Sequence, residues 1–73
     1  MGYSKRDIFE FIIALVNEFA KKFFLSEKQA YNYIRHHKGI YFIEKNYGII
    51  HTLDFNEAID SVACYCRRQG GEL

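Results

Sequence analysis

Hydrophobic residues dominate one long stretch near the start of the chain, residues 8–24. On a helical wheel, the apolar side chains of I-F-E-F-I-I-A-L-V-N-E-F-A-K-K-F-F cover an arc of roughly 220°. A surface helix needs an apolar stripe only about 100° wide. The pattern therefore predicts a helix that packs from more than one direction, inside a helical cluster or against a second chain. The middle of the arc is formed by Ile12, Val16, Phe19 and Phe23. Its flanks are formed by Ile8, Phe9, Phe11, Ile13, Leu15 and Phe24.

Capping residues set the limits of this helix and of the next one. Ser4 is suited to cap the first helix, which we expect to continue to Phe24. Ser26 and Gln29 fit a capping box that opens a second helix, over residues 27–38. Gly39 stands where a left-handed C-terminal cap is expected. The predicted inner face of the second helix consists of Ala30, Tyr33, Ile34 and His37.

The middle of the chain is less regular. Residues 40–47 predict a short third helix, which Gly48 is expected to end. Ile40, Ile43 and Tyr47 share one face of it, so Tyr41, Phe42 or both are expected to be exposed. Residues 49–53, I-I-H-T-L, fit either an extended strand or a connector. A single strand would have no partner in this chain.

A fourth helix is predicted after Asp54, because Asp54 and Glu57 have the spacing of a helix-capping pair. The glycine pair 70–71 is expected to end it. Cys64 and Cys66 are two residues apart on this helix and point about 200° apart, so they cannot form a disulfide there. The face that we expect to be buried consists of Phe55, Ile59, Val62 and Cys66.

Together these elements predict an all-α fold, a compact four-helix domain over residues 1–73 with the hydrophobic N-terminal helix at its centre. A chain of 73 residues buries only about 60% of its unfolded surface. Hydrophobic residues make up 49% of the sequence, and six Tyr and seven Phe are among them. Large aromatic side chains can fill a small core, so a single folded domain is expected.

The charge balance limits the classes of function. A formal net charge of +1 is too even for a protein that binds nucleic acid mainly by neutralising phosphates. The N-terminal apolar run is interrupted by Glu10 and has no small-residue cleavage site after it, so it does not fit a signal peptide. A membrane span would need about 20 mostly uncharged residues. We therefore expect a cytoplasmic protein that does not contact the membrane.

The histidines and cysteines do not have the spacing of a metal site. Neither C-x₂-C nor H-x₃-H occurs, and the adjacent His36 and His37 diverge by about 100° on a helix. We expect no metal and no cofactor. His51 and Thr52 are expected to stabilise the irregular segment by hydrogen bonds to the backbone. A catalytic His51 would need a nucleophile such as Ser61 or Cys66, and because no paired acid, base and nucleophile is evident, we expect no enzyme.

Helix-turn-helix DNA binding is the alternative function for a small helical domain. The second helix, Gly39 and the third helix have the required order. The third helix has no Arg for reading guanine, however, and offers only Tyr41, Glu44, Lys45 and Asn46. The surplus of aromatic side chains favours a protein partner or a homodimer, with Tyr and Phe as anchors. A small nucleic-acid-binding regulator remains the alternative.

Residues 19–71 resemble a small bacterial family of unknown function. Its members are short, carry an L-H-T or E-H-T motif and, in one branch, close with a C-x-R-x-G-G-like segment. Here the corresponding motifs are I-H-T, with Ile50 before His51 and Thr52, and C-R-R-Q-G-G over residues 66–71. The matching positions are Ala30, Gly39, Phe42, Tyr47, His51, Thr52, Ala58, Asp60, Cys66, Gly70 and Gly71.

The resemblance implies a binding partner and not an enzyme. Members of that family are often encoded beside small proteins resembling ADP-ribosyltransferases, an arrangement typical of toxin–antitoxin or accessory pairs. We therefore expect a non-enzymatic protein-interaction module, an accessory or antitoxin-like partner of such a neighbour. The motif residues with an expected structural or partner-binding role are Gly39, Tyr47, His51, Thr52, Cys66, Gly70 and Gly71.

Overall fold

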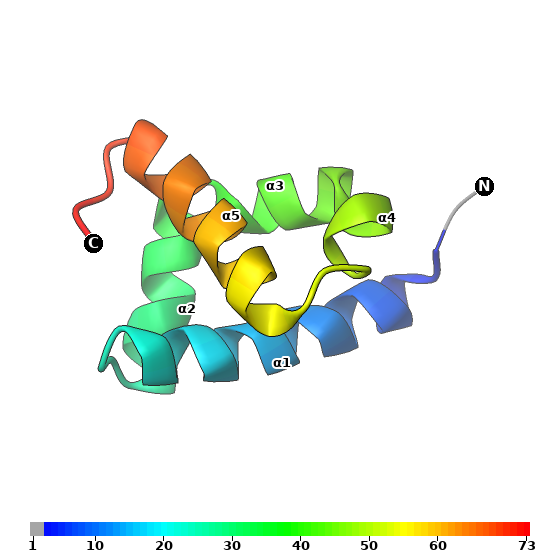
Figure 1. Ribbon diagram of the computed structural model, residues 1–73, viewed down its shortest axis with the longest axis horizontal. Helices are drawn as coiled ribbons and strands as arrows, with labels where there is room; N and C mark the ends of the chain where they lie inside the picture. The colour runs from blue at the N-terminus through cyan, green and yellow to red at the C-terminus, as the bar shows by residue number, and fades with distance from the viewer. Residues whose placement is uncertain (1–2) are drawn as a thin grey trace.

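The computed structural model describes residues 3–73, and these residues form helices and no strand (Figure 1). The prediction of an all-α fold is confirmed. The long first helix lies along one side of the molecule, with α2 near its C-terminal end and α5 crossing the bundle (Figure 1). The helices are α1 (Lys5–Lys22), α2 (Glu27–His36), α3 (Gly39–Lys45), α4 (Tyr47–Ile50) and α5 (Phe55–Arg68).

Helix α1 begins as predicted and ends earlier than predicted. The Ser4 hydroxyl accepts a hydrogen bond from the Asp7 N–H at 3.0 Å. The expected continuation to Phe24 is wrong, because Phe24 has a left-handed backbone with φ of 57°. The next N–H, that of Leu25, then returns to the Ala20 carbonyl at 2.9 Å. This bond closes the end of the helix in the manner of a Schellman motif, with Phe24 at the position that usually holds glycine.

The junction between α2 and α3 also differs from the prediction. Helix α2 ends at His36, and Lys38, not Gly39, takes the left-handed conformation, with φ of 65°. Gly39 is instead the buried first residue of α3. A Cβ atom on Gly39 would lie 2.5 Å from Ile34 Cγ2 and 3.0 Å from Cys66 Sγ. The glycine is required there because three helices approach each other closely, and not because of its backbone angles.

Helices α3 and α4 divide the middle of the chain differently from the prediction. Helix α3 stops at Lys45, and Gly48 lies inside α4 rather than ending a helix. The Asn46 side-chain amide donates to the Phe42 carbonyl at 2.9 Å, which helps to end α3. Residues 49–53 form no strand, because Ile49 and Ile50 complete α4 and the following residues form turns. The structure thus has a fifth, one-turn helix that the sequence pattern did not predict.

Helix α5 has the predicted ends. The Asp54 carboxylate accepts from the Glu57 N–H at 2.9 Å. At the other end, Gly70 has φ of 99°, and the Gly71 N–H donates to the Cys66 carbonyl at 2.9 Å. Together with the bond from the Gly70 N–H to the Arg67 carbonyl at 3.1 Å, this is a Schellman motif.

The core lies between one face of α1 and the inner faces of α2, α3 and α5. Most of the predicted inner positions are buried. The prediction that Phe55 is buried is wrong, because it lies at the start of α5 and is exposed. On the flanks of the α1 arc, Phe9, Ile13 and Phe24 are exposed, so the arc extends beyond the core of this chain. The buried cluster consists of Ile12, Leu15, Val16, Phe19, Ala20, Ala30, Ile34, Ile43, Ile50, Ala58, Ile59, Val62, Ala63 and Cys66.

The length and polarity of the helices also bear on membranes. Over residues 3–73, no helix combines the length and the apolar character that crossing a bilayer would require.

Candidate protein-interaction groove

Two large apolar side chains project from the outer side of α1. Phe9 is 62% exposed and Ile13 is 47% exposed. They are four residues apart, so they lie next to each other on one face of the helix. Tyr31 of α2, also exposed, lines the same hollow as both of them. Adjacent exposed apolar side chains of this size are typical of interaction sites.

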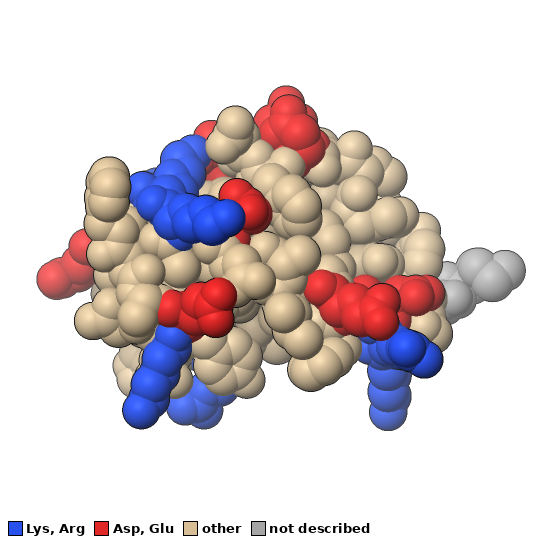
Figure 2. Space-filling model, turned by 90° about the horizontal axis from the view of Figure 1, so that it is seen from below, with Lys and Arg blue, Asp and Glu red and all other residues tan. Residues whose placement is uncertain are grey.

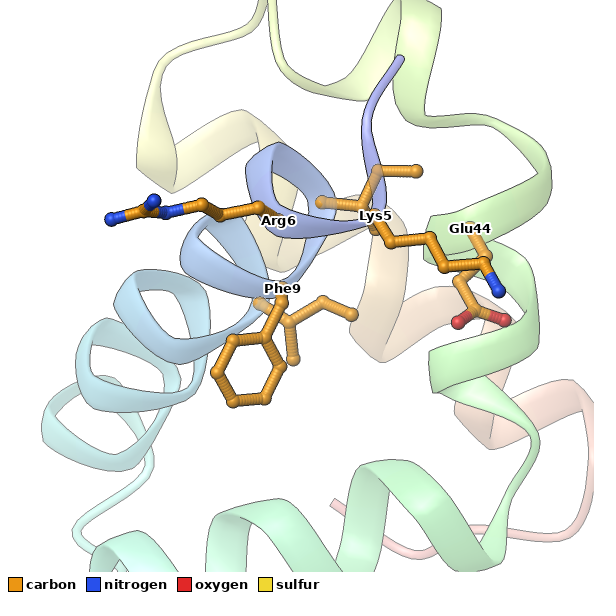
Figure 3. A pocket seen from close by; sticks show the side chains of 6 residues that line it. Lys5, Arg6, Phe9 and Glu44 are labelled. Atoms are coloured by element: carbon orange, nitrogen blue, oxygen red, sulfur yellow. The ribbon is translucent and has the colours of Figure 1, made fainter. Parts of the chain in front are cut away.

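A hollow of about 760 Å³ lies beside Phe9, between the first turns of α1 and helix α3. Figure 3 shows Phe9 beside this hollow, with Lys5 and Glu44 pointing toward one another at one end and Arg6 pointing away. Ile8, Phe9 and Ile12 form its apolar part, and the other lining residues are charged. The hollow is lined by Lys5, Arg6, Ile8, Phe9, Ile12 and Glu44.

A second hollow, of about 260 Å³, continues from the first along α1 toward α2. The two hollows share Phe9 and Ile12. We call the combined feature the α1 groove. From Lys5 to Asn17, at about 1.5 Å per residue, the groove follows α1 for roughly 18 Å. The second hollow is lined by Phe9, Ile12, Ile13, Val16, Asn17, Glu27, Lys28 and Tyr31.

The rim of the α1 groove carries charges of both signs at each end. Lys5 and Glu44 line the first hollow, and Glu27 and Lys28 line the second. Within the part of the chain that the structure describes, none of these four side chains takes part in an ion pair. A rim of this kind can form ion pairs with a partner of mixed charge.

The face of the molecule on which α1 lies also mixes the two signs. Figure 2 shows small groups of charged side chains there, most of them with acidic and basic side chains next to each other, and uncharged surface between the groups. No continuous basic stretch crosses this face (Figure 2). A surface that binds nucleic acid through its phosphates would carry such a stretch.

The predicted motif residues lie outside the α1 groove, in two separate clusters. The first contains Tyr47, His51 and Thr52. His51 Nδ1 lies 2.7 Å from the Tyr47 carbonyl oxygen, which can only accept, so Nδ1 carries the proton. The Thr52 hydroxyl donates to the Ile49 carbonyl at 2.6 Å. Both side chains therefore hold the turn that follows α4.

Aromatic rings surround this turn. The His51 ring stacks on Tyr47, with centroids 4.6 Å apart, and meets the edge of Tyr3 at 5.0 Å. Tyr3 in turn lies 4.8 Å from Tyr47, so this residue packs against α4. Burial raises the pKa of the Tyr47 hydroxyl. The cluster joins the residues before α1 to the turn after α4, which gives it a structural role.

The second cluster contains Gly39, Cys66, Gly70 and Gly71. Cys66 is fully buried against Gly39, and burial raises the pKa of its thiol to about 11. Cys64 is exposed on the other side of α5, as predicted. A Cβ atom on Gly71 would clash with the Tyr33 hydroxyl and lie 2.9 Å from the Cys66 carbonyl oxygen. Gly39, Cys66 and Gly71 therefore serve close packing at the end of α5, and Gly70 supplies the left-handed backbone that ends the helix.

His36 and His37 are neighbours at the end of α2. The rings of His36 and His37 do approach each other, with centroids 4.9 Å apart. Among residues 3–73, however, no group of three His, Cys, Asp or Glu side chains is placed to hold a metal ion.

The sequence pattern indicated only some of the residues of the α1 groove. The wide apolar arc included Phe9 and Ile13 on its flanks and predicted packing inside a helical cluster or against a second chain, without separating the two. Tyr31 and Glu44 carry no local signal, because the fold alone brings α2 and α3 beside them.

Comparison with protein families matches residues 10–69 to a family described as a protein of unknown function, DUF3791. Comparison with curated proteins and with solved structures finds no match.

Proposed function

The chain belongs to the DUF3791 family, whose function is unknown, and we propose that it is a non-enzymatic protein-interaction module that binds its partner in the α1 groove. The observation that carries this proposal is the exposure of Phe9 and Ile13 beside two hollows, on a helix whose adjacent face builds the core. Exposing such side chains to water is unfavourable unless a partner covers them.

The shape of the groove favours a helix as the bound element. An amphipathic helix binds an apolar groove through side chains at positions i, i+3 or i+4, and i+7. Three such anchors extend over about 10 Å of helix, and the groove follows α1 for roughly 18 Å, so a helix of about three turns can lie in it. The charges at both ends of the groove would then set the direction and register of the bound helix.

The finer proposal concerns the partner. The resemblance of residues 19–71 to a family often encoded beside ADP-ribosyltransferase-like proteins supports an accessory or antitoxin-like role toward such a neighbour. The motif residues Gly39, His51 and Cys66 stabilise the fold, so the binding surface of the proposal lies elsewhere, on α1.

A nucleic-acid-binding regulator is the second candidate. It is favoured by one observation, the two consecutive helices α2 and α3 with only His37 and Lys38 between them. Against it, α3 has seven residues, and Lys45 donates to the Tyr41 hydroxyl on the same helix. The mixed charge of the surface in Figure 2 also disfavours phosphate binding.

The proposal can be tested by affinity capture from a native lysate with three forms of the protein: wild type, Phe9→Asp and Ile49→Asp. Ile49 is 69% exposed on α4 and lies outside the groove, so it matches Phe9 in exposure and apolar character. We expect Phe9→Asp to lose a protein that wild type and Ile49→Asp both retain. Thermal melts of both variants check that they remain folded.

Two outcomes would contradict the proposal. One is equal capture by wild type and Phe9→Asp of every protein identified by mass spectrometry. The other is a shift of random duplex DNA by the wild-type protein, with affinity that falls steeply as salt rises, which would favour the regulator.

A further inference from the structure

We propose that the α1 groove binds a second copy of this chain, so that the α1 helices of two copies pack antiparallel about a two-fold axis that crosses them. The proposal rests on the function proposed above, in which the groove is a protein-binding surface, and it names a second copy as what fills the groove, so that a neighbouring protein would meet the dimer. A two-fold contact uses the same surface on both copies, so that surface must be complementary to itself. The α1 groove meets this requirement in shape and in charge.

The shape is self-complementary because the groove contains both ridges and hollows. Phe9 and Ile13 form a ridge on α1, and hollows of about 760 Å³ and 260 Å³ adjoin it. Helices pack by placing the side-chain ridges of one into the grooves of another. When two copies face each other in antiparallel directions, the ridge of each copy meets the hollows of the other.

The charges are self-complementary in the same arrangement. The axis would place the end with Lys5 and Glu44 of one copy against the end with Glu27 and Lys28 of the other. The pairing that joins opposite charges sets Lys5 against Glu27 and Glu44 against Lys28. The two-fold axis generates each of these pairs twice. Within residues 3–73, the same four side chains form no ion pair.

A dimer of standard size would cover a sizeable part of this chain's surface. A standard interface buries about 800 Å² of each partner, which is roughly a sixth of the 5016 Å² that this chain exposes. The groove, together with Tyr31 and the charged rim, lies on the three helices α1, α2 and α3. Its centre is apolar and its rim is charged, as in typical protein interfaces.

The first experiment measures the mass of the purified protein by light scattering and sedimentation over a concentration series up to the millimolar range. We expect a monomer–dimer equilibrium for wild type and for Ile49→Asp. Phe9→Asp is expected to be monomeric, because a buried carboxylate without a partner would disfavour the contact. Circular dichroism melts of all three forms separate a loss of dimer from a loss of fold.

The second experiment tests the pairing of the two ends with reversed charges. Glu44→Lys and Lys28→Glu each place like charges opposite one another twice in a homodimer, so each variant alone should dimerise about tenfold more weakly or worse. In an equimolar mixture, each variant can pair with the other. The lysine introduced at position 44 of one chain then faces the glutamate introduced at position 28 of the other, and the second pair is the wild-type Glu44 and Lys28. The mixture should therefore restore the wild-type dissociation constant.

A matched mixture controls for net charge. Glu72→Lys and Lys38→Glu change the charge by the same amounts at positions outside the groove. Each of these variants is expected to dimerise like wild type, and mixing them should change nothing. If the control mixture gains as much affinity as the groove mixture, simple charge attraction explains the result and the proposed pairing is wrong.

The outcomes separate this inference from the proposed function. A wild-type protein that stays monomeric at all concentrations overturns the second copy as partner, as does a dimer that Phe9→Asp leaves unchanged. If such a monomer still captures another protein and loses it on Phe9→Asp, the groove binds a different chain and only the homodimer fails. If neither a dimer nor a Phe9-dependent partner is found, both proposals fail.

Discussion

At the residue scale, the junction between α2 and α3 shows that two neighbouring residues can have different physical roles. Lys38 and Gly39 are neighbours, yet the lysine has the left-handed backbone and the glycine is helical. The left-handed conformation is unfavourable for Lys38. A lysine at position 39 and a glycine at position 38 would be more unfavourable still. A side chain on Gly39 would collide with Ile34 and Cys66. Packing between helices therefore decides where the glycine stands.

We predict that Gly39→Ala lowers the free energy of unfolding by about 1–3 kcal/mol, because its Cβ would lie 2.5 Å from Ile34 Cγ2. Gly48→Ala is the control. Gly48 is helical and exposed, and a Cβ there would lie 3.6 Å from the nearest atom, in the Tyr3 ring. Alanine should be neutral or stabilising by up to about 1 kcal/mol there. Equal effects of the two substitutions in a denaturant melt would contradict the close approach at Gly39.

Phe24 allows a test of backbone strain without loss of packing. It has φ of 57° and is 95% exposed. A left-handed residue with a side chain costs about 1–2 kcal/mol, and glycine loses part of this gain through the entropy of the unfolded chain. Phe24→Gly should therefore raise the free energy of unfolding by about 0.5–1 kcal/mol. A loss of stability in the melt would show that the Phe24 ring makes contacts that the structure does not contain.

Cys66 predicts how stability depends on alkaline pH. Burial raises the pKa of its thiol from 9.0 to about 11, so between these values the unfolded chain loses a proton that the folded chain keeps. The free energy of unfolding should therefore be unaffected by this group below pH 9 and should fall as pH rises from 9 to about 11. Burial also raises the pKa of Tyr33 and Tyr47, which act in the same direction. Urea melts at several pH values measure this slope.

Cys66→Ala is the matched variant for that slope. It should be less stable at neutral pH because it leaves a cavity, and its stability should fall less steeply between pH 9 and 11. A slope equal to that of wild type would assign the pH dependence to other groups.

At the element scale, α1 has two faces with different tasks. Phe19 is fully buried and belongs to the core, whereas Phe9 is 62% exposed beside the hollows. The same residue type on one helix thus serves packing at one position and, in the proposed function, binding at the other. The apolar arc in the sequence is wide because it includes both faces.

We predict that Phe19→Ala lowers the free energy of unfolding by about 3–5 kcal/mol, the usual range for a buried phenylalanine. Phe9→Ala should change it by less than about 1 kcal/mol when measured at a concentration where the protein is monomeric, because little surface around Phe9 is buried. Two-state denaturant melts of both variants provide the comparison. A large loss for Phe9→Ala would mean that Phe9 is part of the core.

At the scale of the whole molecule, the features that could be predicted from the sequence are the local ones. Capping pairs such as Ser26 with Gln29 depend on residues three positions apart, and the structure contains the predicted hydrogen bonds. Helical periodicity likewise predicted the all-α class and the buried thiol of Cys66. These signals are independent of how the helices are arranged.

The features that could not be predicted depend on that arrangement. Gly39 was expected to end α2, and the close approach of α2 and α5 to the start of α3 explains its true position. The one-turn helix α4 lacks the length for a periodic signal. The groove needs Glu44 of α3 and Tyr31 of α2 beside α1, and no pattern along the chain relates these residues. A wide apolar arc cannot by itself separate a core face from a binding face.

The central claim, that the α1 groove is a binding surface, can be measured most directly with a tryptophan at position 9. The chain has no Trp, so Phe9→Trp and the control Ile49→Trp each introduce the only one. As the protein is concentrated, or as a captured partner is added, the account predicts that emission from position 9 shifts to shorter wavelength and becomes protected from acrylamide quenching. Emission from position 49 should stay solvent-exposed throughout. Position 9 remaining exposed under every condition in which the protein associates would contradict the claim.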